Sequence, residues 1–389
     1  MAQHDVLNLP IVMALMHILS LLFALLLSIF LGSYLTYFAY LWKHAKAPWN
    51  LQFDRNFQPK ITILVPVHNE EKTIESKLEN IKSIDYPKEK MEVIVVDDAS
   101  EDKTLEEAKS FMENNSDINL RIIRQNVHAG KSAALNKALE FCTTDIVVVS
   151  DADTFWPSEI LQKTLPYLSD PKVGAVTGRG VNRNAFQSWV TKGENFYLRL
   201  TSLLRLGESK IHSTIRFEGG FCAYKRSAFK WFDYETGSDD SGTALETVQN
   251  GFRAIMAPEA VFYTDFPTKF QEKFKVKVRR ANQLISLWFK CFKLMVGGKL
   301  RLPKRIAIPE IMLFIIDPLI FLALSATTVI ALALFPLSFF SITLTLLIVG
   351  FLVFARHAFV ELVLDNFILS YALVTFLAGR RYVAWGKPD

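Results

Sequence analysis

Two long apolar stretches constrain this chain more than any other feature of its sequence. No Asp, Glu, Lys or Arg stands between Pro10 and Trp42, and only Asp317 interrupts the run from Ile311 to Phe354. A helix needs about 20 consecutive apolar residues to cross the hydrocarbon core of a bilayer. Both stretches exceed that length, so the sequence predicts a multi-pass protein of the cell membrane.

The flanks of the first stretch indicate its orientation. A cleaved signal peptide would have a basic segment before the apolar run and small residues at a cleavage site, and neither is present. Residues 1–10 contain no Lys or Arg, whereas Lys43 and Lys46 follow the stretch. Because positive residues concentrate on the cytoplasmic side of spanning helices, we expect the N-terminus outside and the following domain in the cytoplasm.

Between residues 61 and 150, short apolar strands alternate with helices. Runs rich in Val and Ile predict four strands, at 61–67, 91–98, 120–124 and 145–150. Helices are predicted between them, at 69–83, 102–111 and 131–141. This alternation is typical of βαβ units and a parallel sheet. No Gly-x-Gly-x-x-Gly follows any of these strands, which argues against an ordinary dinucleotide-binding domain.

Three of these strands end in polar residues suited to one ligand. They are His68, Asn69 and Glu70 after the first strand, Asp97 and Asp98 after the second, and Asp151 and Asp153 after the fourth. Because the carboxyl ends of parallel strands meet at one edge of a sheet, we expect these side chains to lie close together. An Asp-x-Asp pair there can hold a divalent cation, which in turn holds phosphate oxygens. A lone pair of this kind more often marks a solvated turn, but the joint pattern favours a ligand site.

Composition argues against some other functions. The net charge of +5 over 389 residues is modest, and no basic and aromatic motif suggests nucleic-acid binding. The three cysteines, Cys142, Cys222 and Cys291, lack the spacing of a metal site and fit a reducing compartment. An anionic membrane surface is the better partner for the excess positive charge.

Taken in order along the chain, these residues resemble the motifs of glycosyltransferase family 2. The resemblance covers about residues 60–290 and rests on the segments Val65–Glu71, Val95–Ser100, His128–Asn136 and Ser150–Asp153. Members of this family are inverting enzymes of the GT-A fold that use nucleotide-sugar donors. The resemblance therefore implies an α/β GT-A domain, accompanied here by transmembrane helices.

The resemblance also implies a role for each of these residues. Asp98 would accept hydrogen bonds from the nucleotide base, with Asp97 beside it. Lys131 would lie near the diphosphate, Asp151 would contact the sugar-nucleotide, and Asp153 would bind Mg²⁺ or Mn²⁺. Such a cation stabilises the charge that develops as the nucleoside diphosphate leaves. The residues that would shape the nucleotide pocket are Pro66, His68, Asn69 and Glu70.

The segment Arg216–Arg226 resembles the strand that lies beside the acceptor in this family. There a pair of glycines lets the backbone approach the substrate. The residues expected on this acceptor side are Gly219, Gly220 and Phe221. A hairpin with a bulge is the alternative interpretation.

A pair of adjacent aspartates matches the position of the family's Glu-Asp motif. Asp239 stands where the family has Glu, and Asp240 precedes Gly251 by eleven residues, as the family spacing requires. That interval points to Asp240 as the base that takes the proton of the acceptor hydroxyl, with Asp239 on the acceptor side.

Residues 269–295 predict an amphipathic helix. Apolar residues recur every three or four positions from Phe270 to Met295, and basic residues such as Lys273 and Lys277 are expected on the opposite face. Such a helix can lie in a membrane interface. Packing on the core of the domain alone is the alternative.

The Gln-x-x-Arg-Trp motif of the family belongs in this helix, where the sequence reads Lys277–Ala281. Arg280 falls on the Arg of the motif and would bind the nucleotide-sugar, but the Gln and the Trp are missing. Since the motif accompanies processive synthesis, its loss favours one transfer to a lipid-linked or membrane-proximal acceptor. A processive polysaccharide synthase that exports its product through its helices is one alternative, and a non-catalytic nucleotide-sugar-binding scaffold is another.

These features divide the chain into four parts. They are an N-terminal transmembrane helix (1–45), a cytoplasmic GT-A domain (55–265), a basic interfacial helix region (266–305) and a C-terminal membrane region (306–389). The expected partners are a nucleotide-sugar donor, a lipid or glycan acceptor, and the membrane, without nucleic acid.

The C-terminal region contains spans at about 309–335 and 337–354. The next apolar segment, Phe359–Leu377, has Glu361 and Asp365 on one helix face. It is either a further span that faces the bundle or an interfacial helix, and the basic residues after it favour the interfacial helix.

Overall fold

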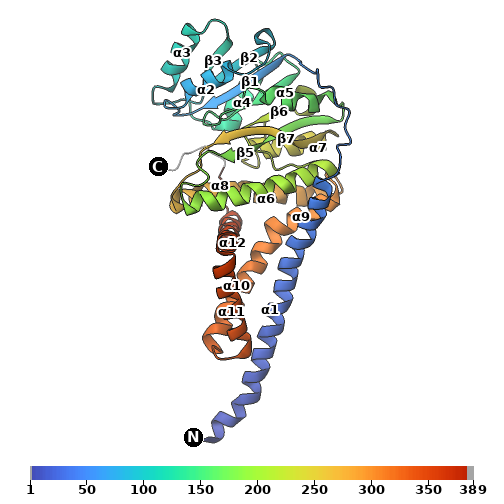
Figure 1. The fold of residues 1–389 in the computed structure, drawn as a ribbon, viewed down its shortest axis with the longest axis vertical. Helices are drawn as coiled ribbons and strands as arrows, with labels where there is room; N and C mark the ends of the chain where they lie inside the picture. The colour runs from blue at the N-terminus through green and yellow to red at the C-terminus, as the bar shows by residue number, and fades with distance from the viewer. Residues whose placement is uncertain (1, 383–389) are drawn as a thin grey trace.

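The structure is a computed structural model that describes residues 2–382. A broad α/β domain sits at one end of a narrow group of helices, and two long helices lie between them (Figure 1).

A seven-stranded sheet forms the centre of the α/β domain, with the strand order β3-β2-β1-β4-β6-β5-β7. The strands are β1 (Ile61–Val67), β2 (Met91–Asp97), β3 (Asn119–Arg124), β4 (Ile146–Val149), β5 (Val173–Asn182), β6 (Cys222–Lys225) and β7 (Arg253–Thr264). β1 to β4 are parallel, as predicted. β6 is antiparallel to both of its neighbours, β4 and β5, and β7 lies parallel to β5. The strand expected near residues 216–226 is therefore β6, at the centre of the sheet and not in a hairpin.

Helices cover both faces of the sheet, which explains the long apolar runs in β1, β2 and β4. Ile63 and Val65 of β1 face a core shared with α2 (Ile74–Lys82) and α3 (Thr104–Asn114). Leu64, between them, faces the opposite core, which includes α4 (Lys131–Leu139). The shorter helices of the domain are η1 (Lys88–Lys90), α5 (Ile160–Thr164), η2 (Leu165–Ser169), η3 (Arg226–Ala228) and α7 (Asp239–Gln249).

Two long helices, α6 (Trp189–Ile211) and α8 (Phe270–Val296), separate the sheet from the helices below it (Figure 1). The sequence patterns above predict α8 but not α6. The capping box of α6 is a signal that could have found it. The Ser188 side chain accepts a hydrogen bond from the Thr191 amide, and the Thr191 side chain accepts one from the Ser188 amide.

The predicted charge pattern of α8 is wrong in one respect. Lys273 and Lys277 do not lie on an outer basic face, because both are buried. Lys273 Nζ lies 2.5 Å from Glu361 Oε1, and Lys277 Nζ lies 2.9 Å from a Glu194 carboxylate oxygen and 2.6 Å from one of Asp365. A buried ammonium group needs such partners. Helical periodicity alone could not show that α6 and a later helix would cover this face.

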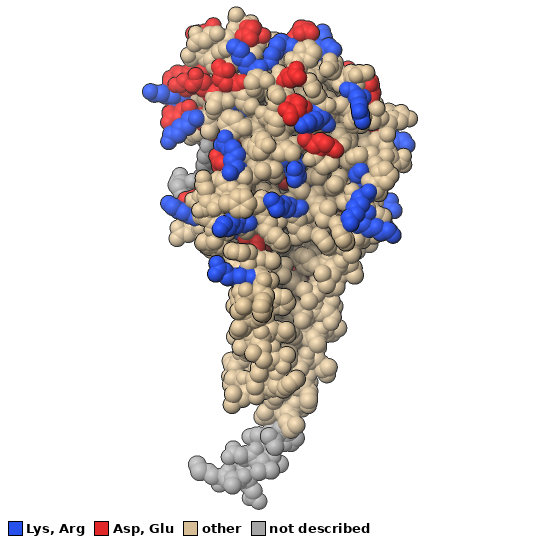
Figure 2. Space-filling view, in the orientation of Figure 1, with Lys and Arg blue, Asp and Glu red and all other residues tan. Residues whose placement is uncertain are grey.

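The helices below this layer, which we call the stalk, are α1 (Ala2–Ala45), α9 (Lys304–Ile311), the π-helical turn η4 (Met312–Ile316), α10 (Asp317–Leu334) and α11 (Phe339–Phe354). Charged side chains crowd the α/β domain, whereas the visible face of the stalk carries almost none (Figure 2). Among the described residues, three segments are long and apolar enough to cross a membrane: Ile11–Ala45, Lys304–Leu334 and Arg356–Leu377. α11 is apolar but shorter.

The last helix, α12 (Arg356–Leu377), packs along α8. Glu361 pairs with Lys273, and further along both helices the ring of Phe376 stacks on that of Phe289 at a centroid distance of 5.0 Å. Figure 1 shows α12 almost end-on, whereas α1 and α11 run down the stalk. Because α12 is also long and apolar enough to cross a membrane, the choice between a further span and an interfacial helix stays a prediction.

Candidate active site

The loops after β1 and β2 meet at one edge of the sheet and interlock. The Asn69 amide donates to Ser100 Oγ over 2.9 Å, and the Glu101 amide donates to Asn69 Oδ1 over 2.9 Å. Asn69 and Ala99 both adopt left-handed backbone conformations, with φ of 55° and 57°. Such conformations are unfavourable for Ala and occur where the surrounding structure fixes them, often at functional sites.

Asp98 is buried and holds the loop that leads into α4. Its carboxylate accepts hydrogen bonds from the amides of Ala129 and Gly130, at 2.9 and 2.7 Å, and lies 2.9 Å from His128 Nδ1. Gly130, at φ 91°, has a conformation that favours glycine. Since Lys131 is the next residue, Asp98 sets the position from which the Lys131 side chain starts.

The other predicted residues of this edge lie at different depths. Asp97 is buried and accepts a hydrogen bond from the Ser100 amide. His68 stacks on His128 at a centroid distance of 3.9 Å, so His128 joins the site as a residue for which no separate role was predicted. Pro66 is buried within β1, and Glu70 is buried with a carboxylate oxygen that accepts a hydrogen bond from the Thr73 hydroxyl.

Lys131 occupies the centre of the site, between two carboxylates from distant parts of the chain. Its Nζ lies 2.7 Å from Asp151 Oδ1 and 3.1 Å from Asp239 Oδ2. Gly219 leaves the space for this arrangement, because a Cβ atom there would lie 2.6 Å from Lys131 Nζ. The structure thus brings together residues predicted for the diphosphate, the sugar and the acceptor.

Electrostatics distinguishes the two aspartates that begin α7. Burial raises the pKa of the Asp239 carboxyl to about 6, opposed by Lys131 and assisted by Asp240 and Asp151. Burial alone would lower the pKa of Lys131, but these carboxylates raise it well above its usual value, so the lysine stays charged. Asp240 Oδ1 instead accepts hydrogen bonds from Ser238 Oγ and the Ser241 amide, at 2.7 and 2.6 Å.

Asp151 and Asp153 offer a partial site for a divalent cation. Asp153 is exposed, and the Asp151 side chain is 27% exposed with one oxygen on Lys131. Carboxylate oxygens suit Mg²⁺ and Mn²⁺. Within residues 2–382 no group of three or more His, Cys, Asp or Glu side chains could enclose a metal ion. Oxygens from a bound diphosphate and from water would therefore have to complete the coordination.

The structure places Arg279, and not the predicted Arg280, near these carboxylates. Arg280 is exposed on α8. The pKa of Arg279 is lowered by burial and by Arg280, while Asp151, Asp239 and Asp153 act in the opposite direction. One residue along a helix turns the side chain by about 100°, which accounts for the difference.

The Phe221 side chain lies in the core, and the place of this residue on the acceptor side stays a prediction. Phe221 has no exposed surface and packs edge-on against Trp156 at a centroid distance of 4.9 Å. Gly220 is required for packing, because a Cβ atom there would lie 2.2 Å from the Phe262 ring. Of the glycine pair, Gly219 alone borders the charged centre of the site.

Lys77 of α2 belongs to the site although no motif includes it. Its ammonium group is fully buried, donates a hydrogen bond to the Thr154 carbonyl and lies 4.3 Å from the centre of the Trp156 ring. Burial lowers its pKa to about 7, against the influence of Asp151 and Asp153. A lysine in the apolar stripe of a helix was the signal, since the neighbouring buried positions are Ile74, Leu78 and Ile81.

The mixed seven-stranded sheet, the strand-end carboxylates and Lys131 define a glycosyltransferase domain of the GT-A type. Residues 62–232 match the family model "Glycosyl transferase family 2", so this part of the chain is a domain of that family. The structure resembles that of a mannosyltransferase from Pyrobaculum calidifontis in complex with GDP-Man and Mn²⁺. The TM-score is 0.81 at 29% identity, and the match covers 93% of this chain and 100% of the other.

Curated relatives match the α/β domain over part of their length. A probable glycosyltransferase YdaM of Bacillus subtilis (strain 168) is 28% identical over 239 residues, which are 59% of this chain and 57% of that protein. A poly-beta-1,6-N-acetyl-D-glucosamine synthase of Staphylococcus aureus (strain COL) is 29% identical over 232 residues, 57% of this chain and 54% of the relative. The match thus spans little more than half of each relative. The family and the fold inferred from the motifs are confirmed.

Proposed function

We propose that this protein is a membrane-bound inverting glycosyltransferase that moves a sugar from a UDP- or GDP-sugar to a lipid-linked or membrane-proximal acceptor. The observation that carries the proposal is the position of Lys131 between Asp151 and Asp239. This arrangement places an ammonium group, which can bind a diphosphate, beside a carboxylate, which can accept a proton. The complex of the Pyrobaculum protein with GDP-Man supports a nucleotide-sugar donor.

In this proposal each residue of the site has a distinct role in the reaction. Lys131 would balance the charge of the diphosphate, and Asp151 and Asp153 would hold Mg²⁺ or Mn²⁺. When bound, such a cation stabilises the negative charge that develops on the leaving nucleoside diphosphate. Asp98 would act earlier, by orienting the loop before Lys131 and, as the resemblance implies, by binding the base.

The aspartates at the start of α7 would supply the base. As the acceptor oxygen forms its bond to the anomeric carbon, the bond from that carbon to the diphosphate oxygen breaks on the opposite face. The hydroxyl proton passes to a carboxylate. The family spacing favours Asp240, whereas the pKa of Asp239, raised by burial, and its place at the charged centre favour the earlier residue.

The place of the site in the fold supports an acceptor near the membrane. Arg279 interacts electrostatically with the carboxylates of the site from α8, the helix that packs against α12 and lies above the stalk. An acceptor that enters along this layer would meet the charged centre at the membrane surface. The charges that flank α1 and α9 favour a cytoplasmic position for the domain.

One observation favours a second candidate. The Staphylococcus aureus relative is a polysaccharide synthase, so repeated transfer to a growing chain is the alternative. The altered Lys277–Ala281 segment favours a single transfer.

Product size separates these functions. Membranes that contain the full chain are incubated with Mn²⁺ and a panel of labelled UDP- and GDP-sugars, and the products are extracted and sized. We expect one labelled product of low mass in the lipid fraction. A ladder of high mass would instead identify a polysaccharide synthase. Tight binding of a nucleotide-sugar by the purified protein, without transfer or hydrolysis of any sugar in the panel, would identify a scaffold.

A further inference from the structure

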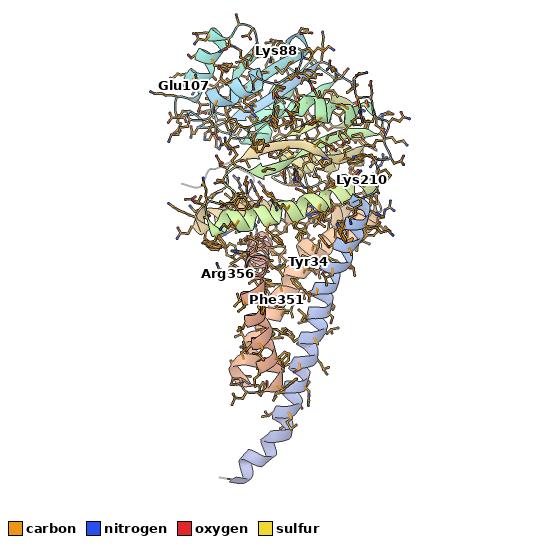
Figure 3. The ribbon with its side chains drawn as sticks, in the orientation of Figure 1. Tyr34, Lys88, Glu107, Lys210, Phe351 and Arg356 are labelled. Atoms are coloured by element: carbon orange, nitrogen blue, oxygen red, sulfur yellow. The ribbon has the colours of Figure 1, made fainter. Side chains whose placement is uncertain are left out.

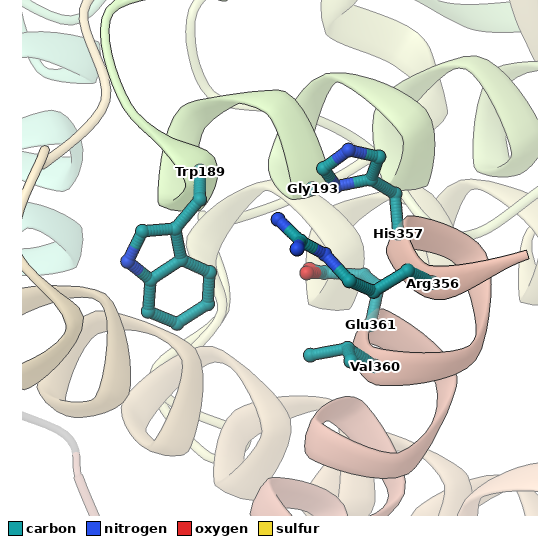
Figure 4. A pocket seen from close by; sticks show the side chains of 6 residues that line it. All are labelled: Trp189, Gly193, Arg356, His357, Val360 and Glu361. Atoms are coloured by element: carbon teal, nitrogen blue, oxygen red, sulfur yellow. The ribbon is translucent and has the colours of Figure 1, made fainter. Parts of the chain in front are cut away.

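A pocket of about 180 Å³ lies where α11 ends and α12 begins, away from the residues of the candidate active site. Trp189 and Gly193 of α6 line one side, and residues of α12 line the other (Figure 4). The α12 residues are Arg356, His357, Val360 and Glu361. A water molecule occupies about 30 Å³ in the liquid, so the pocket has room for a small polar group.

Two basic side chains at this pocket have no partner among the described residues. Arg356 and His357 are exposed, and neither forms a hydrogen bond or an ion pair with any residue in the described range 2–382. In Figure 4 the Arg356 side chain extends from α12 toward Trp189. The first turn of α12 has no acidic residue and no side-chain cap, so its free amides add to the positive character of this corner.

The one carboxylate of the pocket wall is already neutralised. Glu361 Oε1 accepts hydrogen bonds from Lys273 and Lys277, at 2.5 and 3.1 Å. Gly193 allows this close packing, because a Cβ atom there would lie 2.1 Å from the other Glu361 oxygen. Arg356 therefore remains available for an anion from outside the protein.

The pocket lies at the level where the apolar surface of the stalk gives way to charged residues. Phe354, the last residue of α11, is 91% exposed, and Arg356 follows two residues later. Figure 3 shows Phe351 on the stalk below Arg356. Trp189, half exposed on α6, is an amphipathic aromatic residue of the kind enriched at the boundary between bilayer and water.

We propose that this pocket binds the phosphate of an anionic membrane lipid. The planar guanidinium of Arg356 suits two phosphate oxygens, and His357 supplies a further donor. The acyl chains would follow the exposed apolar residues of α11, beside which the pocket opens. The site is separate from the sugar-transfer centre, shares no residue with it, and fixes the corner between α11 and α12 at the membrane surface.

Binding of short-chain lipids to the purified full chain in neutral detergent tests this inference. Dioctanoylphosphatidylglycerol and dioctanoylphosphatidylcholine are titrated separately, and dissociation constants are measured by calorimetry. The wild-type protein should bind the anionic lipid about tenfold more tightly, which corresponds to about 1.4 kcal/mol. In the double variant Arg356→Gln, His357→Gln the two lipids should bind alike.

Two controls make the result decisive. Arg305→Gln removes another exposed cation at the start of α9 and should leave the lipid preference unchanged. Inorganic phosphate should compete only weakly with the anionic lipid. The inference is overturned if the double variant keeps the preference, or if Arg305→Gln abolishes it equally. If inorganic phosphate competes at a concentration equal to that of the lipid, the ligand is a free anion and not a lipid, and the inference is overturned.

Discussion

The Lys77 ammonium group donates a 2.7 Å hydrogen bond to the carbonyl oxygen of Thr154 from a fully buried position. Thr154 directly follows Asp153, so this bond fixes the loop that carries both carboxylates of the Asp-x-Asp pair. Lys77 thus acts on the site from beneath, without reaching the space that a substrate would occupy.

Replacing Lys77 with Met should slow transfer without unfolding the protein. The Met side chain keeps most of the volume but removes the hydrogen bond and the charge, and small displacements of catalytic groups are costly. We expect kcat to fall by about 10- to 100-fold, while the protein stays folded because Met fills the same space and removes the cost of burying a charge. Lys82→Met, on the same helix but in a partly exposed ion pair, is the control. Unchanged kcat with lower stability would show that Lys77 has only a structural role.

Stability should depend on pH through the same lysine. Its pKa is about 7 in the folded protein against an ordinary value of 10.5. Between these values the unfolded chain binds a proton that the folded chain does not, so this residue makes stability increase as pH rises from 7 to 10.5. Unfolding midpoints at pH 7.5 and 9.5 should therefore differ less in Lys77→Met than in the wild type. An identical difference in both proteins would contradict the lowered pKa.

Single substitutions can identify the base at the start of α7. Asparagine keeps the shape of the side chain but removes the proton acceptor, so loss of the base should reduce turnover by about 10²- to 10⁴-fold with little change in donor affinity. If Asp239 is the base, wild-type turnover should rise as pH increases through about 6, where its carboxyl loses its proton. A near-normal Asp240→Asn together with an inactive Asp239→Asn would overturn the assignment based on spacing, and the reverse result would confirm it.

Asp153→Asn should act differently from either of these variants. As a ligand of a divalent cation, Asp153 would contribute both to donor binding and to the rate. We expect a higher Mn²⁺ concentration for half-maximal activity and a weaker affinity for the nucleotide-sugar. The comparison with Asp240→Asn is informative, because a loss of turnover alone, with unchanged Mn²⁺ dependence, would exclude Asp153 as a ligand.

Removal of Arg216 should destabilise the junction between the α/β domain and the stalk. Its guanidinium lies 3.4 Å from Glu208 and 3.2 Å from Glu310, and both carboxylates are buried. Arg216→Ala leaves them without this partner, at a cost of about 3–5 kcal/mol. Arg183→Ala, which breaks the exposed pair with Asp265, should cost less than about 1 kcal/mol. Equal shifts of the thermal midpoint in the two variants would contradict this difference.

The first half of the sheet was predictable because its physical cause is local. β1, β2 and β4 are buried on both faces, so their apolar runs stand out in the sequence, and parallel pairing brings their polar ends together. The residues that these polar strand ends contact were harder to predict from the sequence. Asp239, which pairs with Lys131, follows β6, and β6 lies between β4 and β5, an order that residue patterns do not show.

Buried charges mark the limit of prediction from sequence. A lysine such as Lys273 looks like a surface residue until its partner, Glu361, is known to lie against it, 88 residues further along the chain. Phe221 is the converse case, because it lies in a segment that resembles a functional motif whereas its side chain packs in the core. In both cases the deciding information is which surface another part of the chain covers.

The buried network around Arg216 has a consequence for the choice of acceptor. Glu208 of α6 also accepts a 2.9 Å hydrogen bond from the Tyr37 hydroxyl of α1, and Glu310 belongs to α9. Arg216 lies three residues before Gly219, so the wall of the active site is tied to two helices of the stalk. In the proposed arrangement, with the stalk across the bilayer, these contacts would hold the reacting centre at a constant height above the membrane surface. Spacer length should then decide between acceptors of equal chemistry, because only a hydroxyl presented at that height can reach the sugar.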